Sequence, residues 1–242
     1  MIHVRHNTGA RATVVAALIV AVATGCGTTP EPDPYATLGG DAAVASYRWF
    51  AEGDIDLESP EMQVVRAYVE SLDAWLRTKD KDAVYTGFDD FIDPDSDPAP
   101  QRGTVNLHVF DVEPDTDFEG RPSTRVGVCF DYSGRPEENS DTGEWRIRRT
   151  AYYDSMYVTR TDPATPNSPA IDPQHRLPYP TWNVFDGWDV QRFNDMRTDP
   201  ESPRTRCLND PPFDLRAYRN PPVRIPPVVE PAGPGWPTVI DG

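Results

Sequence analysis

The sequence predicts an α+β domain in which N-terminal helices pack on a curved antiparallel sheet, followed by a proline-rich C-terminal tail. Apolar residues recur every three or four positions between residues 41 and 92, which is the period of an α-helix. They alternate between residues 104 and 159, which is the period of a β-strand, and prolines become frequent after residue 208. Helices followed by strands are the order typical of an α+β domain.

The strongest helix prediction covers residues 60–78. Ser59 is a favourable N-cap, Pro60 suits the first helical position, and Glu61 lies where the helix dipole is positive. Five apolar residues then follow one face at intervals of three and four: Met62, Val65, Val69, Leu72 and Leu76. Shorter helices are expected on either side, at residues 41–52 and 81–92.

The strand pattern begins after these helices. Residues 104–112 and 124–132 alternate apolar and polar positions, so they predict the two strands of a hairpin. Residues 145–159 predict one further long strand. Within residues 181–194, Asp186-Gly187 marks a two-residue turn between two apolar arms.

Prolines define two segments that the sequence places outside the sheet. Six prolines between residues 161 and 180 predict a surface excursion, because proline cannot donate to a sheet ladder. Residues 209–242 predict an extended and only partly ordered tail. This tail is interpreted as a spacer or as a belt on its own domain, with docking into an aromatic groove of a partner as the alternative.

Composition limits the partners of the chain. The 242 residues contain 23 Lys+Arg and 39 Asp+Glu, which gives a formal net charge of −16. Nucleic acid is therefore excluded as a general partner, because binding to it depends on neutralising phosphates with basic side chains. Aromatic residues make up 10% of the chain, which is enough to build a core.

The N-terminus has the pattern of an export signal. Arg5 and Arg11 precede an apolar run over residues 12–24, and Gly25 and Cys26 follow it. The run is too short to cross a bilayer as a helix, which needs about 20 apolar residues. Residues 1–25 are therefore predicted to be a signal peptide, and the polar residues 26–40 a flexible tether.

The segment Ala23-Thr24-Gly25-Cys26 resembles a bacterial lipobox. The resemblance implies that Cys26 receives a diacylglyceryl anchor and becomes the first residue of the mature chain. It places the protein on the outer face of the bacterial cytoplasmic membrane, held by acyl chains such as palmitate. An ordinary secretory signal that happens to contain a cysteine is the alternative.

Two cysteines remain once Cys26 is assigned to lipid. Exported proteins live in an oxidising environment, so Cys129 and Cys207 are predicted to form a disulfide. A redox-active or nucleophilic pair is the alternative. Neither cysteine lies in a Cys-x-x-Cys motif that would lower its thiol pKa.

Residues 41–208 resemble the NTF2-like domains of secreted actinobacterial lipoproteins, which are cone-shaped α+β domains. The matching features are the helix at 60–78, residues 129–133 (CFDYS), Arg148-Arg149 with Tyr152 and Tyr153, Trp182-Asn183-Val184 or Trp188-Asp189-Val190, and Cys207. The resemblance implies a possible acid–base pocket inside the cone, formed by Asp131, Arg148, Tyr153 and Tyr157. The alternative is that the arginines pair with surface acids and the tyrosines pack.

No cofactor or metal is predicted. The acidic runs at residues 93–97 and 115–120 lack the twelfth-position carboxylate of a calcium loop and are interpreted as solvated turns. Only His108 and His175 lie outside the signal peptide, and neither has a ligand partner at a useful spacing.

These observations predict a lipid-anchored extracytoplasmic protein with a non-catalytic role in binding or in envelope assembly, with an envelope protein as the possible partner. Two alternatives remain open. One is an NTF2-like enzyme with an acid–base pocket. The other is a phage- or prophage-encoded lipoprotein that excludes other phages at the envelope.

Overall fold

The computed structural model describes residues 45–90, 101–147, 151–162, 171–193, 195, 197, 199–209, 211–214 and 219–239. The chain divides into two units, and the unit Asp33–Gly242 contains all of these residues. Cys26 and the predicted signal peptide and tether lie outside the described residues, as do Arg148 and the acidic run at 93–97. Among the described residues, no helix is both long enough and apolar enough to cross a membrane.

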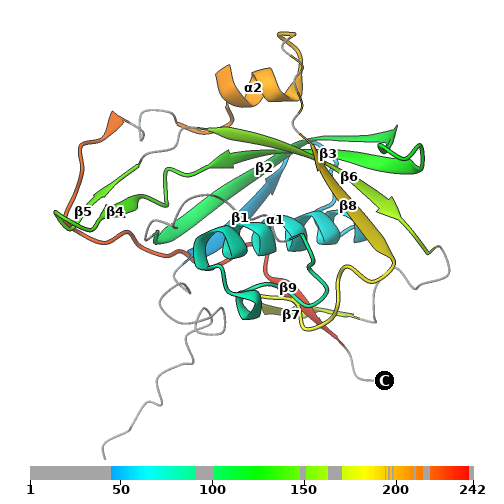
Figure 1. Cartoon of the computed structure of the whole chain (residues 1–242), viewed down its shortest axis with the longest axis horizontal. Coiled ribbons are helices and arrows are strands. Elements are labelled where there is room, and N and C mark those ends of the chain that lie inside the picture. Colours follow the sequence, from blue (N-terminus) through cyan, green and yellow to red (C-terminus); the bar gives the residue numbers. More distant parts are fainter. Residues whose placement is uncertain are drawn as a thin grey trace, which may run out of the picture. The chain divides into compact units, whose positions relative to one another are not determined.

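The fold is mostly β and is built on a five-stranded mixed sheet (Figure 1). The strand order is β1-β2-β3-β6-β8; β1 and β2 run parallel, and the other neighbours are antiparallel. The strands are β1 (Ala45–Ala51), β2 (Gly103–Thr116), β3 (Pro122–Asp131), β6 (Tyr152–Arg160) and β8 (Trp188–Phe193). Two small ribbons complete the strands: β4 (Glu137–Asn139) with β5 (Glu144–Arg146), and β7 (Ile171–Leu177) with β9 (Trp236–Val239).

The predicted fold class is wrong. Strands hold 39% of the described residues and helices 18%, and the first described element is a strand rather than a helix. The predicted helix at 41–52 is strand β1 over its described part, because its aromatic residues favour a pleated surface and the segment pairs with β2. Of the predicted helix at 81–92, residues 81–90 are described, and within them the helical part is the short 3₁₀ turn η2 (Lys81–Ala83). The chain therefore does not form the cone of helices on an antiparallel sheet that the NTF2-like resemblance implied.

The long helix prediction is confirmed by α1 (Pro60–Thr78). The Ser59 hydroxyl accepts a hydrogen bond from the Met62 amide at 3.3 Å, and Lys79 ends the helix in the left-handed conformation with φ 56°. Figure 1 shows α1 between the large sheet and the β7–β9 ribbon. Both faces of the helix are therefore covered, and polar side chains such as Arg66 and Glu70 are buried along with the apolar ones.

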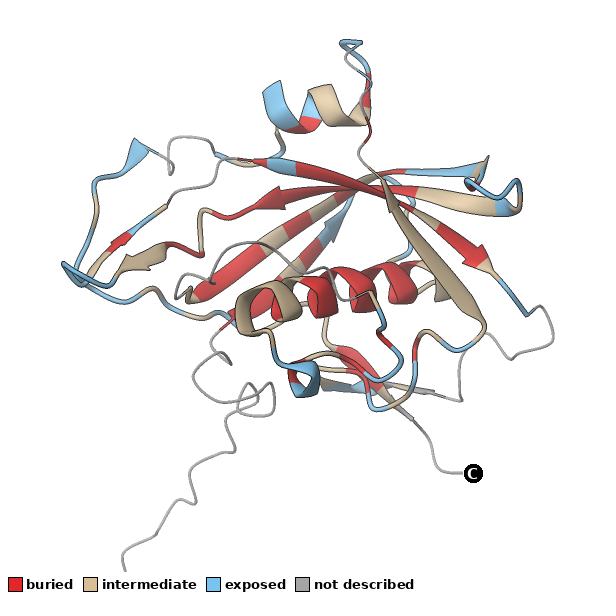
Figure 2. Ribbon diagram, viewed as in Figure 1, coloured by how far each residue is buried: buried red, intermediate tan, exposed pale blue. Residues whose placement is uncertain are grey.

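The predicted hairpin is confirmed by β2 and β3, whereas the predicted strand at 145–159 is divided into β5 and β6. The turn at Asp186-Gly187 forms with φ 76° at Gly187, but only its second arm is a strand, β8. In Figure 2 the buried residues follow α1 and the facing strands, where the main core lies. A smaller core on the opposite face of the sheet surrounds Cys129 and the short helix α2 (Pro203–Asn209).

Both proline-rich predictions need correction. The segment at 161–180 contains β7, and the tail contains β9, whose Trp236 is only 1% exposed. Pro173 and Pro237 are tolerated because both strands of a two-stranded ribbon are edge strands. The outer side of an edge strand pairs with no further strand, so a missing amide proton there removes no hydrogen bond. Over its described residues 219–239 the predicted tail runs along its own domain, as the belt interpretation had it, and β9 enters the core.

Candidate functional site

The most concentrated group of buried polar side chains lies on the sheet face opposite α1. Asp111, Gly127 and Ser155 are cross-strand neighbours on β2, β3 and β6. A β-bulge between Val109 and Asp111 turns the Asp111 side chain to this face. We call Asp111, Tyr153 and Ser155, which surround Gly127, the polar row.

Gly127 leaves the space that the Tyr153 side chain fills. A Cβ atom at position 127 would lie 2.2 Å from the Tyr153 hydroxyl oxygen and 2.9 Å from its Cζ atom. Glycine in the middle of a strand often marks such a close approach. The Tyr153 hydroxyl is therefore held directly over the backbone of β3, beside Ser155 and Asp111.

The polar row is almost sealed from solvent. Asp111 and Tyr153 are each 6% exposed, and Ser155 is 0% exposed. Among the described residues, the Tyr153 hydroxyl, the Ser155 hydroxyl and Asp111 Oδ2 have no hydrogen-bond partner. Burial raises the pKa of Tyr153 to about 12. Burial also raises the pKa of Asp111; Arg125 opposes this shift and Glu113 adds to it.

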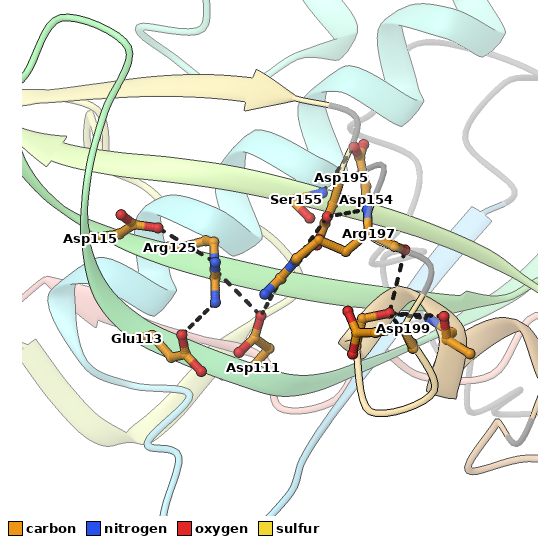
Figure 3. Close-up of polar contacts among 11 residues, drawn as sticks. Asp111, Glu113, Asp115, Arg125, Asp154, Ser155, Asp195, Arg197 and Asp199 are labelled. Atoms are coloured by element: carbon orange, nitrogen blue, oxygen red, sulfur yellow. Dashed lines mark hydrogen bonds and ion pairs between the residues drawn. The ribbon is translucent and has the colours of Figure 1, made fainter.

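Arg125 on β3 joins three carboxylates of the neighbouring strand (Figure 3). Its guanidinium is paired with Glu113 and lies 3.6 Å from Asp111 and 3.5 Å from Asp115. These acids alternate along β2 beyond the bulge, so all three reach the same face. One cation therefore compensates a stripe of three negative side chains.

A second arginine reaches the polar row from the chain between β8 and α2. Arg197 makes a close pair with Asp195 at 2.6 Å and lies 3.7 Å from Asp111 Oδ2 (Figure 3). Burial raises the pKa of Asp195, but the hydrogen bonds from Arg197 outweigh this and lower it overall. Asp111 is thus approached by two guanidinium groups, one from the sheet and one from the covering chain.

The predicted disulfide is confirmed and anchors this covering chain. Cys129 on β3 and Cys207 on α2 are bonded, with their Cα atoms 5.6 Å apart and both residues 0% exposed. Tyr153 and the ring of Phe110 belong to the same small core. The disulfide therefore fastens α2 to the face that carries the polar row.

The residues predicted to form an acid–base pocket have different roles. Asp131 is 3% exposed, and its carboxylate accepts hydrogen bonds from the Ser133 amide at 2.8 Å and from Asn106 at 3.1 Å. Tyr157 stacks on Phe193 with ring centroids 4.5 Å apart. Tyr153 alone of the predicted residues belongs to the polar row, and Arg148 lies outside the described residues.

The sequence patterns did not predict a site at Asp111, Arg125, Ser155, Asp195 or Arg197. Two signals in the sequence point toward them. Val105, Leu107 and Val109 alternate on the core side, so an acid at 111 in the same register indicates a bulge. A glycine inside the apolar strand 124–132 indicates a close approach. No local signal indicates Asp195 or Arg197, because they reach the site only through tertiary folding.

A second buried polar centre lies on the α1 side. The Glu70 carboxylate accepts hydrogen bonds from Trp49 at 2.8 Å, Tyr85 at 2.5 Å and Trp236 at 3.2 Å. Burial raises the pKa of Glu70, although Arg66 and the three donors act in the opposite direction. This centre joins β1, α1 and β9, and its donors satisfy the carboxylate.

Among the described residues, no three or more His, Cys, Asp or Glu side chains are grouped so as to hold a metal ion. No family model, curated protein or solved structure matches this chain.

Proposed function

We propose that this chain is an exported lipoprotein, held through Cys26 on the outer face of the bacterial cytoplasmic membrane. Its folded domain would bind a component of the envelope or support an envelope assembly without catalysing a reaction. The single observation that supports this proposal most is the buried disulfide between Cys129 and Cys207.

The disulfide supports export through the number of cysteines. Disulfides persist in oxidising compartments and are rare in the reducing cytosol. Pairing Cys129 with Cys207 leaves Cys26 as the third cysteine of the chain, directly after the apolar run of the predicted signal. That position is where a lipoprotein signal requires its acylated cysteine.

The contacts of three predicted pocket residues argue against the alternative of an acid–base enzyme. Tyr153 fills the space above Gly127, Asp131 holds the chain after β3, and Tyr157 packs on Phe193. An acid or base must reach the proton that it transfers. These side chains instead contact neighbouring parts of the same domain, which is the behaviour of structural residues.

The test is acylation and fractionation of the full chain in a bacterial host that processes lipoproteins. The wild-type chain should incorporate labelled palmitate, lose residues 1–25 and float with membranes. Cys26→Ala should incorporate no palmitate and either leave the membrane fraction or remain as the unprocessed precursor. Thr28→Ala, two residues further along, is the matched control and should behave as the wild type. Processing and flotation of Cys26→Ala equal to the wild type would contradict the proposal.

A further inference from the structure

One histidine lies on the sheet face that carries the disulfide and α2. His108 on β2 is the direct cross-strand neighbour of Cys129 on β3 and of Phe50 on β1. Its ring stacks on Phe50, with the ring centroids 4.9 Å apart and an angle of 15° between the planes. The imidazole is therefore held against β1 in a defined orientation.

The chain that follows α2 contacts the same imidazole. We call residues 211–214 the cover. The Phe213 ring centroid lies 5.3 Å from that of His108, and Phe213 also packs against the small core around the disulfide. Pro211 and Pro212 have no amide proton to donate to the sheet. The contact between Phe213 and His108 therefore joins the cover directly to β2.

The Nε2 atom of His108 is buried and has no hydrogen-bond partner among the described residues. A neutral imidazole carries a proton on one nitrogen, whereas the imidazolium ion carries a proton on both. A protonated His108 would therefore place a charged N–H donor where no described group accepts it, which costs free energy. While the cover is in place, the geometry favours the neutral ring.

Charged residues lie beside His108 on each element that packs against it: Arg48 and Glu52 on β1, Asp131 on β3, Arg206 on α2 and Asp214 on the cover. Glu52 and Asp131 favour the protonated ring, but Glu52 is itself paired with Arg206 at 2.9 Å. Burial outweighs both acids and lowers the pKa of His108 from its ordinary value of 6.5. Electrostatics and geometry therefore act in the same direction.

We propose that His108 and Phe213 form an acid-sensitive latch, in which protonation of His108 releases residues 211–214 from the sheet. In the open state water reaches Nε2, so the open state binds the proton more tightly than the closed state does. Opening therefore increases as the pH falls below about 6.5, by about tenfold for each unit by which the pKa of His108 differs between the two states. The disulfide keeps α2 on the sheet, so the cover is the part that moves. This proposal does not depend on the lipid anchor at Cys26.

The first test uses the reciprocity of the latch. If protonation opens the cover, removing the cover must make protonation easier. The pKa of His108 is measured in the full chain by NMR titration of its Cε1 proton, which His108→Gln identifies. Phe213→Ala should raise this pKa by about 0.5 or more toward its ordinary value. Leu208→Ala, at a 37% exposed position of α2, is the matched control and should leave it unchanged. Equal values in the wild type and in Phe213→Ala would overturn the latch.

The second test follows the cover itself, in protein labelled with 4-fluorophenylalanine. The fluorine resonance of Phe213, identified by its loss in Phe213→Leu, should be broadened more strongly by a soluble gadolinium chelate as the pH falls from about 7.5 to about 5. The resonance of Phe88, which is 7% exposed in the main core, should not change, because the domain stays folded.

Two histidine variants separate the latch from other acid effects. His108→Gln does not titrate in this range, so the broadening at Phe213 should become independent of pH. His175→Gln, at the exposed histidine beside Asp172, should behave as the wild type. Broadening that is flat with pH in the wild type, or that depends equally on pH in His108→Gln, would overturn the proposal; in the second case the nearby acids would open the cover.

Discussion

The indole nitrogen of Trp236 donates a hydrogen bond to the Glu70 carboxylate at 3.2 Å. The two residues are 166 positions apart, and this contact joins the polar side of α1 to strand β9. Arg66 strengthens the same junction, because its guanidinium lies 4.3 Å from the Trp236 ring centroid and donates to the Pro234 carbonyl at 2.7 Å. The C-terminal segment is therefore a structural part of the core.

Trp236→Ala should destabilise the domain by about 3–5 kcal/mol, because it empties a fully buried aromatic site. Trp236→Phe should cost less, about 1–3 kcal/mol, because it keeps a ring but leaves Glu70 one donor short. The free energy of unfolding in urea measures both. Val228→Ala, at an exposed position of the proline-rich segment, should change it by less than about 0.5 kcal/mol. A value for Trp236→Ala as small as that of Val228→Ala would show that β9 is not a structural part of the core.

Gly127→Ala should destabilise the domain by about 1–3 kcal/mol, because the new methyl group overlaps the Tyr153 hydroxyl. Tyr153→Phe removes that oxygen, so the double variant Gly127→Ala/Tyr153→Phe should be more stable than the sum of the two single effects predicts. A double-mutant cycle from urea unfolding measures this coupling. Strict additivity would mean that the hydroxyl does not lie over Gly127.

Native wild-type protein should contain no free thiol at Cys129 or Cys207 and should resist mild reductants, because both sulfurs are buried. Titration with a thiol reagent before and after denaturation measures this. Cys129→Ala/Cys207→Ala should lose up to about 4–5 kcal/mol of stability, since the bond closes a long loop in the unfolded chain. Free thiols in the native, purified protein would contradict both the pairing and the argument for export.

Asp154 should make the domain less stable as the pH rises from about 4 to about 6. Burial raises its folded-state pKa to about 6, although Arg192 opposes the shift, so the folded state holds the proton longer than the unfolded state does. The contribution is absent below the unfolded pKa and reaches about 3 kcal/mol of destabilisation above the folded one.

Asp154→Asn removes this contribution. Its stability relative to the wild type should therefore rise across that pH range and stay constant above it. Urea unfolding of both proteins at several pH values measures the difference. Asp73→Asn is the control with the opposite sign, because Arg135 and Arg77 hold the pKa of Asp73 below its usual range despite burial. A relative stability of Asp154→Asn that is flat with pH would show that Asp154 titrates normally.

The sequence by itself determined the features that depend on residues close together in the sequence. The cap at Ser59 and the spacing of apolar residues were enough to place α1, and alternation was enough to place the β2–β3 hairpin. The pairing of Cys129 with Cys207 was also predicted, once the lipobox resemblance had set Cys26 apart. Each of these signals lies within one element or in a simple count, so no knowledge of distant contacts was needed.

Only the tertiary structure decided what the remaining segments form. Ala45–Ala51 is a strand because it pairs with β2. In the proline-rich segment, β9 joins the core because Trp236 donates a hydrogen bond to Glu70. Asp111 and Arg197 approach each other because a bulge turns Asp111 to this face and the chain between β8 and α2 brings Arg197 to it. Strand pairing and polar burial join residues that are distant in the sequence, so local propensity does not determine them.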